Sequence, residues 1–377
     1  NYTNKPPKGA GLLNWGKITI GQVSIIPDDS KYEKYIVSQS QLKVTLDTKK
    51  IDPYFANYFF RSPVGQHRLL ANASQVGVPA IAKASTSVKE ILLPCPKLSI
   101  QKRVVEILRS LDNKIELNRQ MNATLESMAQ ALFKSWFVDF DPVIDNALAA
   151  GNPIPEPLQA RAEARKALGD KRKPIPEEIC KQFPSSFVFT EEMGWVPEGW
   201  SMGKLSDLLE VKYGKDHKKL NKGIVPVYGS GGLMRYADKS LYAGESVLIP
   251  RKGTLSNILY LNEEFWTVDT MFYTIPKNRY APKYAFYHLK SLDFVSMNVG
   301  SAVPSMTTKV LNKLPIVIPD ETALQNFDSI LTSYFDKTEA NNKQFQSLTK
   351  LRDTLLPQLL SGQLRIPEAE NQLVEAL

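Results

Sequence analysis

Residues 99–138 read SIQKRVVEILRSLDNKIELNRQMNATLESMAQALFKSWFV, and this stretch decides the fold. It contains no Gly and no Pro, and its apolar side chains recur every three or four positions. That spacing is typical of one face of an amphipathic helix. A helix of this length extends about 60 Å and needs a partner helix to bury its apolar face. The apolar positions are Val104, Leu108, Leu111, Ile115, Leu125, Met128, Leu132 and Trp136.

The sequence supplies a partner helix in the same chain. Residues 321–362 read ETALQNFDSILTSYFDKTEANNKQFQSLTKLRDTLLPQLLSG and align with the first stretch, without a gap, at a shift of 223 positions. We interpret this as an internal repeat of one unit, a globular part followed by a long helix. The identical pairs include Pro96 and Pro319, Ile107 and Ile330, Leu108 and Leu331, Ser110 and Ser333, Lys114 and Lys337, Glu116 and Glu339, Asn118 and Asn341, Leu125 and Leu348, and Leu132 and Leu355.

Composition narrows the class of protein. The 377 residues, 43% of them hydrophobic, allow two or three domains. Cys95 and Cys180 are isolated in the sequence, which favours a reducing cytoplasm over a disulfide framework. Without a signal peptide or an apolar run near the ~18 residues that span a bilayer, we expect no membrane partner. The net charge of +8 and the pI of about 9.1 suggest a polyanionic partner such as nucleic acid.

These observations predict an α/β protein of the α+β type. It has two mixed α/β domains separated by two long antiparallel coiled-coil helices, with an internal pseudo-repeat. We divide the chain into a first domain at 1–96, a first long helix at 97–140, a Pro-rich connection at 141–193, a second domain at 194–319, and a second helix with a tail at 320–377.

Shorter elements follow from alternation and turn residues. Within the connection, Phe140-Asp141-Pro142 should end the long helix and leave an extended chain apart from a short helix at 158–168. Elsewhere we predict strands at 18–26, 35–46, 86–93, 225–228, 246–250, 258–261, 271–275 and 313–319, and aromatic helices at 53–61 and 282–292.

The two halves differ at their start. Val37 aligns with Val268 in the repeat, but the second half has about 70 residues before that point and the first has 36. We therefore expect the first half to lack a counterpart of residues 194–215, GWVPEGWSMGKLSDLLEVKYGK.

The sequence offers no catalytic or metal-binding motif. His67, His217 and His288 have no His or Cys at ligand spacing, so we predict surface or packing roles and no metal site. The glycine cluster at 229–232 lacks the Lys and Ser/Thr of a phosphate loop and should form a turn between strands.

Basic and aromatic residues instead alternate on predicted loops. Lysines can neutralise phosphates, whereas Arg, Asn, Ser and Tyr can read base edges. The candidate DNA-binding residues of the second half are Lys212, Tyr213, Lys215, Lys218, Lys219, Tyr228, Ser230, Arg235, Arg251, Lys252, Thr254 and Asn257. Those of the first half are Lys17, Tyr32, Lys34, Gln75 and Lys83.

Apolar and amide positions on the long helices are the candidates for partner binding. A buried Asn in a helix pair can fix register, although Asn118 and Asn341 could also lie on the solvated side. The candidates are Leu111, Ile115, Asn118, Leu125, Trp136, Tyr334, Asn341, Leu348 and Leu355.

Several motifs, in order along nearly the whole chain, resemble the specificity subunit of type I restriction–modification systems. They are LPCPKLSIQKRVVEIL at 93–108, LFKSWFVDFDPV at 132–143, GWVPEGW at 194–200, VYGSGGL at 227–233, PRKGT at 250–254, VDTMFY at 268–273 and LLPQLLSGQL at 355–364.

The resemblance implies a non-catalytic DNA-recognition subunit. Each of two target-recognition domains would read half of a split double-stranded DNA sequence, and the helices would hold the domains apart. Two methyltransferase subunits, which use S-adenosylmethionine, would dock on the chain, and two ATP- and Mg-dependent motor-endonuclease subunits would join them. This chain itself would hold no cofactor.

Three alternatives stay open at this point. The chain could be a regulatory mimic that binds methyltransferase subunits without DNA, although its basic loops argue against mimicry of an acidic polymer. It could be a coiled-coil scaffold for proteins. It could also be a fused endonuclease, which would need a cluster of metal-binding carboxylates.

Overall fold

The computed structural model describes residues 2–4, 11–14, 21–26, 30, 32, 34–36, 38, 41–74, 80–169, 177–192, 194–294, 296–297 and 305–376. For residues 2–4, 11–14 and 74 only the backbone is described. The chain forms two compact units, a first unit of residues 1–122 and 338–377 and a second unit of residues 123–337. The five-segment division of the sequence stays a prediction.

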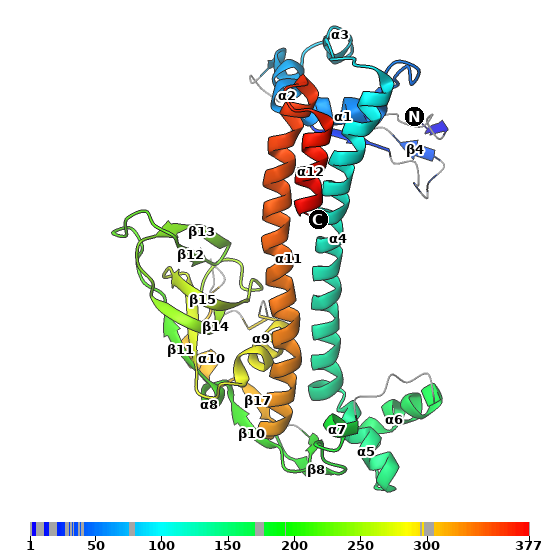
Figure 1. Ribbon diagram of the computed structural model, residues 1–377. Helices are drawn as coiled ribbons and strands as arrows, with labels where there is room; N and C mark the ends of the chain where they lie inside the picture. The colour runs from blue at the N-terminus through cyan, green and yellow to red at the C-terminus, as the bar shows by residue number, and fades with distance from the viewer. Residues whose placement is uncertain are drawn as a thin grey trace. The chain divides into compact units, whose positions relative to one another are not determined.

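Both long helices are confirmed (Figure 1). Helix α4 (Leu98–Phe133) continues into a π-helical turn, η1 (Lys134–Val138), and α11 is Glu321–Ser361. The boundary between the two units falls inside α4 and α11, so each unit contains part of both helices.

In the first unit the two helices are antiparallel and share an apolar core. Leu111 and Ile115 of α4 cluster with Leu348 and Leu355 of α11, and none of the four is more than 3% exposed. The apolar periodicity in the sequence thus marks a seam between two helices of the same chain.

The globular part of the first unit has small sheets and short helices. Helix α1 (Pro53–Arg61) matches its prediction, and the Asp52 side chain accepts hydrogen bonds from the first turn of this helix. The other elements are β1 (Tyr2–Asn4) paired with β4 (Lys34–Ile36), the sheet β3-β2-β5 (Val23–Ile25, Gly11–Asn14, Gln41–Val44), β6 (Ala73–Ser74) paired with β7 (Ala80–Ile81), α2 (Pro63–Leu70), α3 (Ala84–Lys89) and α12 (Ile366–Ala376).

Three predictions in this part need correction. The strand predicted at 86–93 is wrong, because Ala84–Lys89 is helix α3. Ala84 and Val88, four residues apart, both pack on Leu69 and Ile81, and this packing outweighs the strand preference of the β-branched residues. The strand at 35–46 is two short strands, and of the strand at 18–26 only Val23–Ile25 is assigned, with residues 18–20 outside the described part.

The segment after the first long helix is helical rather than extended. Phe140 adopts a left-handed conformation (φ 53°), and α5 (Asp141–Ala150) follows with Pro142 in its first turn, where proline is tolerated. The long helix ends before Phe140 as predicted, but the proline lies in the first turn of a new helix and no extended chain follows directly. The predicted helix at 158–168 is confirmed as α6 (Glu156–Leu168), and a short α7 (Glu177–Cys180) follows.

An ion-pair network joins α5 to α6. Arg161 donates two hydrogen bonds to the buried Asp141, at 2.8 and 2.7 Å, and Arg165 donates to Asp145 at 2.7 Å. Burial would raise the pKa of Asp141, but hydrogen bonds from Arg161 and Ser135 and the charge of Arg165 lower it below its ordinary value.

The second unit is built on a six-stranded sheet in the order β11-β16-β14-β15-β12-β13. Neighbouring strands are antiparallel except β12 and β15, which are parallel. The strands are β11 (Leu209–Tyr213), β12 (Val225–Gly229), β13 (Gly232–Ala237), β14 (Tyr242–Pro250), β15 (Leu259–Thr267) and β16 (Met271–Pro276), so the four strand predictions from 225 to 275 are confirmed.

Smaller elements complete the second unit. Strand β17 (Pro315–Ile318) and helix α9 (Ala281–Ser291) confirm their predictions, and the glycine cluster forms the β12–β13 turn as expected. The remaining elements are β8 (Phe187–Thr190) paired with β9 (Gly194–Pro197), β10 (Ser201–Lys204) paired with β17, α8 (Leu205–Leu208) and α10 (Thr308–Asn312).

Within the second unit, side chains of α9 bind the parts of α4 and α11 that belong to this unit. The Lys283 side chain is 3% exposed and lies 2.7 Å from Glu245 and 2.7 Å from Asp328, which is on α11. Tyr287 donates to Glu126 of α4 at 2.9 Å.

Within the described residues, none of the helices is both long and apolar enough to span a membrane.

Candidate nucleic-acid interface

The loops of the second unit gather around one turn. This turn, residues 268–270, joins β15 to β16, and it donates one backbone hydrogen bond and accepts another. The amide of Val268 donates to Tyr228 O at 3.0 Å, and Arg251 N donates to Thr270 O at 2.8 Å. Beside the turn, Lys215 N donates to Thr267 O at 2.8 Å. We call residues 214–224, 229–231, 251–258 and 268–270 the loop cluster.

Side chains fasten the loop cluster internally. Arg235 on β13 donates to the carbonyl oxygens of His217 and Leu220 at 2.8 and 2.9 Å, which braces the lysine-rich loop. Asn257 donates to Ser230 O at 2.9 Å and so ties the β14–β15 loop to the β12–β13 turn. Such pre-ordered loops lose less conformational entropy when they bind a ligand.

Close approach explains Gly253 in this cluster. Its φ is +85°, a conformation that favours glycine, and a Cβ atom here would lie 3.0 Å from Ser230 Oγ. Two loops can therefore touch at Gly253 because it has no side chain.

Positive charge dominates the loop cluster. Its segments carry six basic side chains against two acidic ones, Asp216 and Asp269. Lys215, Lys218 and Lys219 are exposed. A rigid, solvent-facing group of lysines suits phosphate binding. The exposed basic side chains also include Lys222 and Lys252, whereas Arg251 is half-buried.

An aromatic side chain stands beside these charges. Tyr213, at the end of β11, is 51% exposed, and the Arg251 guanidinium lies over its ring at 5.4 Å from the centroid. The Tyr213 hydroxyl lies 3.2 Å from Thr308 Oγ1 on α10. An exposed ring held by a cation offers a stacking or hydrogen-bonding surface to a base or sugar.

Not every candidate is free to bind. Lys212 pairs with Glu210 at 2.5 Å, and this contact raises its pKa. The Tyr228 hydroxyl donates to Glu263 at 2.9 Å, and burial together with this carboxylate raises its pKa above the ordinary value. Arg235 and Asn257 position loops through the hydrogen bonds above. DNA contact by these four side chains stays a prediction.

The candidates of the first unit do not form a comparable group. Lys17 and Gln75 lie outside the described residues. Tyr32 (72% exposed), Lys34 and Lys83 are exposed, and Lys83 has a left-handed backbone (φ 45°). Within the described part of the chain no contact joins these three side chains.

The helix residues expected to bind a partner mostly lie in the core of their own unit. Asn118 and Asn341 are 2% and 3% exposed, so both belong to the seam and the solvated reading is wrong. Asn118 donates to Gln344 Oε1 at 3.0 Å, and Asn341 donates to Asn122 Oδ1 at 2.8 Å. Leu111, Ile115, Trp136, Leu348 and Leu355 are also buried and offer no surface to a separate subunit, whereas Leu125 and Tyr334 are half-buried.

Sequence reasoning missed two parts of the interface. Thr308 approaches Tyr213 from 95 residues away, and the Asp269 carbonyl accepts from Arg251 at 3.1 Å. Neither residue stands out in the sequence, because the packing of α10 against β11 brings Thr308 there and the turn between β15 and β16 brings Asp269. Among the described residues, no group of three or more His, Cys, Asp or Glu side chains is placed to hold a metal ion.

Comparison with known proteins gives a consistent result. The family model of the type I restriction modification DNA specificity domain matches residues 1–127 and 197–350. The type I restriction enzyme HindI specificity subunit of Haemophilus influenzae is 27% identical, over 94% of this chain and 86% of the relative. The type I restriction enzyme MjaIX specificity subunit of Methanocaldococcus jannaschii is 25% identical, over 96% of this chain and 79% of the relative.

A solved structure shows the same fold. The crystal structure of the type I restriction-modification system S subunit from M. genitalium superposes with a TM-score of 0.57 at 18% identity. The match covers 95% of this chain and 84% of that one.

Proposed function

This chain belongs to the family of type I restriction modification DNA specificity domains, and we propose that its loop cluster reads one half of a split DNA target. The observation that carries the proposal is the braced group of exposed lysines beside Tyr213 and Arg251. Lysines on phosphates would set affinity and position, while Tyr213, Ser230 and Thr254 would approach base edges.

Membership of this family supports a further proposal about the assembly. The first unit would read the other half of the target, and α4 with α11 would fix the spacing between the halves. Two methyltransferase subunits using S-adenosylmethionine would dock on this non-catalytic chain in the cytoplasm. Two restriction subunits using ATP and Mg²⁺ would join for cleavage. The loop cluster supports DNA recognition over the scaffold and mimic alternatives, because neither needs a basic surface.

Salt-dependent DNA binding tests the role of the loop cluster. The double substitution Lys218→Ala/Lys219→Ala should weaken binding of the full chain to duplex DNA. It should also reduce the slope of log affinity against log salt by up to about two, close to one for each lost phosphate contact. Fluorescence anisotropy of labelled DNA between 50 and 300 mM salt measures both quantities.

A matched lysine control separates local contacts from net charge. Lys337→Ala and Lys181→Ala also remove two charges from exposed lysines, on α11 and beside α7, outside the loop cluster. These variants should leave the slope nearly unchanged. Equal effects of the two pairs would show that overall charge, and not the loop cluster, attracts DNA.

Mapping of modified bases tests the complete function. The chain is purified with its methyltransferase partner, and a plasmid library is methylated with S-adenosylmethionine. Modified adenines should lie in one split motif with a constant spacer. Partner binding without DNA binding or modification would contradict the proposal and favour a scaffold.

A further inference from the structure

The two halves of the repeat align without a gap just before each long helix, with apolar residues at corresponding positions. At the shift of 223, residues 84–96 align with 307–319, so helix α3 corresponds to α10. After these helices, Leu92–Cys95 corresponds to strand β17. Helix α1 likewise corresponds to α9, since PYFANYFFRS at 53–62 aligns with PKYAFYHLKS at 282–291.

Strand β17 is covered in the second unit. It pairs antiparallel with β10, and the residue before β10, Trp200, packs its ring 5.7 Å from that of Phe137 at the end of the first long helix. Trp200 Nε1 also donates to Asp320 at 3.0 Å. An aromatic side chain followed by a four-residue strand thus fills this place.

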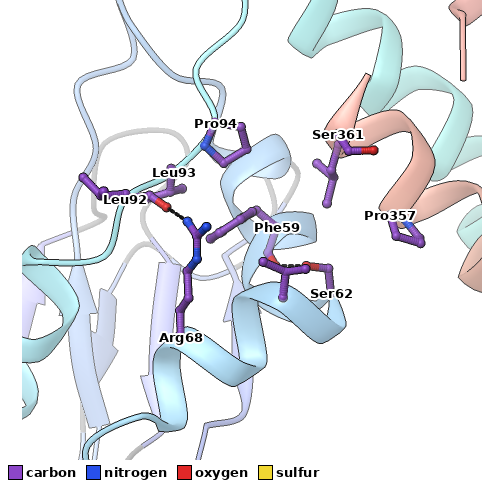
Figure 2. A pocket seen from close by; sticks show the side chains of 10 residues that line it. Phe59, Ser62, Arg68, Leu92, Leu93, Pro94, Pro357 and Ser361 are labelled. Carbon is purple, nitrogen blue, oxygen red and sulfur yellow. Dashed lines mark hydrogen bonds between the residues drawn. The ribbon is translucent and has the colours of Figure 1, made fainter. Parts of the chain in front are cut away.

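The corresponding place in the first unit is an open groove (Figure 2). Leu92–Cys95 belongs to no strand pair within the described part of the chain, and Leu92 is 79% exposed. Beside it lies a cavity of about 340 Å³, between α1, α2 and the end of α11. Its walls include Leu92, Leu93 and Leu360. Leu360 corresponds to Phe137 and Leu93 to Ile316, so two walls of the groove match the residues that Trp200 and β10 cover in the second unit.

The backbone of the open segment is suited to strand pairing. In the second unit Leu205 N donates to Leu314 O at 2.9 Å, and hydrogen-bonded pairs alternate in an antiparallel ladder. The next bonded pairs are therefore Gly203 with Ile316 and Ser201 with Ile318. Their counterparts Leu93 and Cys95 carry N–H groups, whereas Pro94 and Pro96 fall at the positions that do not bond to the neighbouring strand.

One side-chain contact supports the same match. The Arg68 guanidinium donates to Leu92 O, as Figure 2 shows, and His288 hydrogen-bonds the backbone of the counterpart Pro315. The backbone of Leu92 and that of Pro315 are thus both hydrogen-bonded on the side that faces away from β10 or from a strand added in its place. Among the residues that the structure describes, no strand pairs with the groove side of Leu93 and Cys95, so a partner strand can add there.

We propose that this groove seats an extended peptide segment that begins with an aromatic residue and adds a strand along Leu92–Cys95. The occupant has the chemistry of residues 200–204, an aromatic side chain followed by a four-residue strand. Its aromatic ring packs on Leu360, and its backbone pairs with Leu93 and Cys95. Lys97 replaces Asp320 in this unit, so the ring needs no N–H group. The proposal is independent of DNA recognition.

A peptide added in trans tests the site. The probe is a labelled peptide of sequence PEGWSMGKLSDL, residues 197–208, titrated into the full chain and followed by anisotropy. We expect saturable binding of one peptide per chain. A peptide with Trp200→Ala should bind at least about tenfold more weakly, and one with Trp200→Phe should bind within about twofold of the parent. Absence of saturable binding, or equal binding of the Ala peptide, would overturn the proposal.

Backbone methylation tests the strand register without altering the protein. N-methylation of Gly203 removes a donor at a bonding position and should weaken binding about tenfold. N-methylation of Met202, at the position between, should have little effect. Equal effects of the two methyl groups would exclude the proposed ladder.

Disulfide trapping distinguishes binding of the peptide in this groove from replacement of β10 by the peptide in the second unit. A peptide with Ser201→Cys places its thiol opposite Cys95, which is exposed, and oxidised glutathione should join the two. The peptide with Met202→Cys should react at least about tenfold more slowly. Equal rates, or reaction mainly at Cys180, would contradict this location.

Discussion

His288 makes the second unit sensitive to acid. It lies on α9, and its Nε2 is buried with no hydrogen-bond partner among the described residues. Burial lowers its pKa to about 4. Between pH 6.5 and 4, His288 is protonated in the unfolded chain but stays neutral in the folded chain. Stability should therefore fall as pH is lowered through this window, by up to about 3 kcal/mol.

Substitution by glutamine isolates this contribution. His288→Gln should flatten the dependence of Tm on pH between 6.5 and 4, measured by calorimetry of the full chain. His67→Gln is the control, because His67 is exposed on α2 and its loss should leave the dependence intact. An unchanged pH profile in His288→Gln would assign the acid sensitivity to other groups.

Lys283 is a buried cationic side chain of α9. Lys283→Met keeps most of the apolar volume but leaves Glu245 and Asp328, which are 23% and 17% exposed at their side chains, without their cation. We expect a loss of about 3 kcal/mol in the free energy of unfolding, measured by urea denaturation. Lys290→Met should cost below about 1 kcal/mol, since its ion pair with Glu126 is more exposed. Similar losses in the two variants would contradict this ranking.

At the scale of elements, amide side chains set the register of α4 and α11 in the first unit. Asn118→Leu removes a buried amide at 2% exposure and should leave Tm unchanged or raise it. It should also loosen the register, because the hydrogen bond to Gln344 is lost. A cysteine pair at Asn122 and Asn342, whose side chains are in contact, reports register by its rate of disulfide formation. A large loss of stability with an unchanged rate would refute this role.

Elements with a strong apolar periodicity were predictable from sequence. Elements whose type depends on tertiary packing or on the conformation of a neighbouring residue were not. The apolar spacing of α4 and α11 is a local signal that survives folding. Thr86 and Val88 favour a strand, but Val88 packs in a helix on Leu69 and Ile81. The long helix ends before Phe140 as predicted, but no pattern in the sequence indicated that Phe140 would turn the chain in a left-handed conformation and place Pro142 in the first turn of α5.

The candidate site could be predicted only in part for a similar reason. Composition alone pointed to Lys215, Lys218 and Lys219, which are exposed together. It could not separate these lysines from Arg235 and Asn257, whose side chains are used in holding loops. That difference depends on which strands pair, and the parallel pair of β12 with β15 has no signature in the sequence.

At the scale of the whole molecule, helix length should set the spacing of the DNA target. Insertion of four residues after Asn122 in α4 and after Lys337 in α11 lengthens each helix by about 6 Å, close to two base pairs. Mapping of methylated adenines should then show a longer spacer and unchanged half-sites. Substitution of four exposed residues at the same places is the control. A changed half-site with the original spacer would contradict the proposal.

The architecture of the loop cluster has an evolutionary consequence. Its loops connect strands whose core residues, such as Val247 and Phe272, are fully buried, so substitutions of the exposed loop side chains cost little folding energy. Mutation can therefore sample new loop sequences while selection on the sheet preserves the fold. We expect target preference to drift between lineages much faster than architecture, so related chains could share this scaffold and yet protect different genomes.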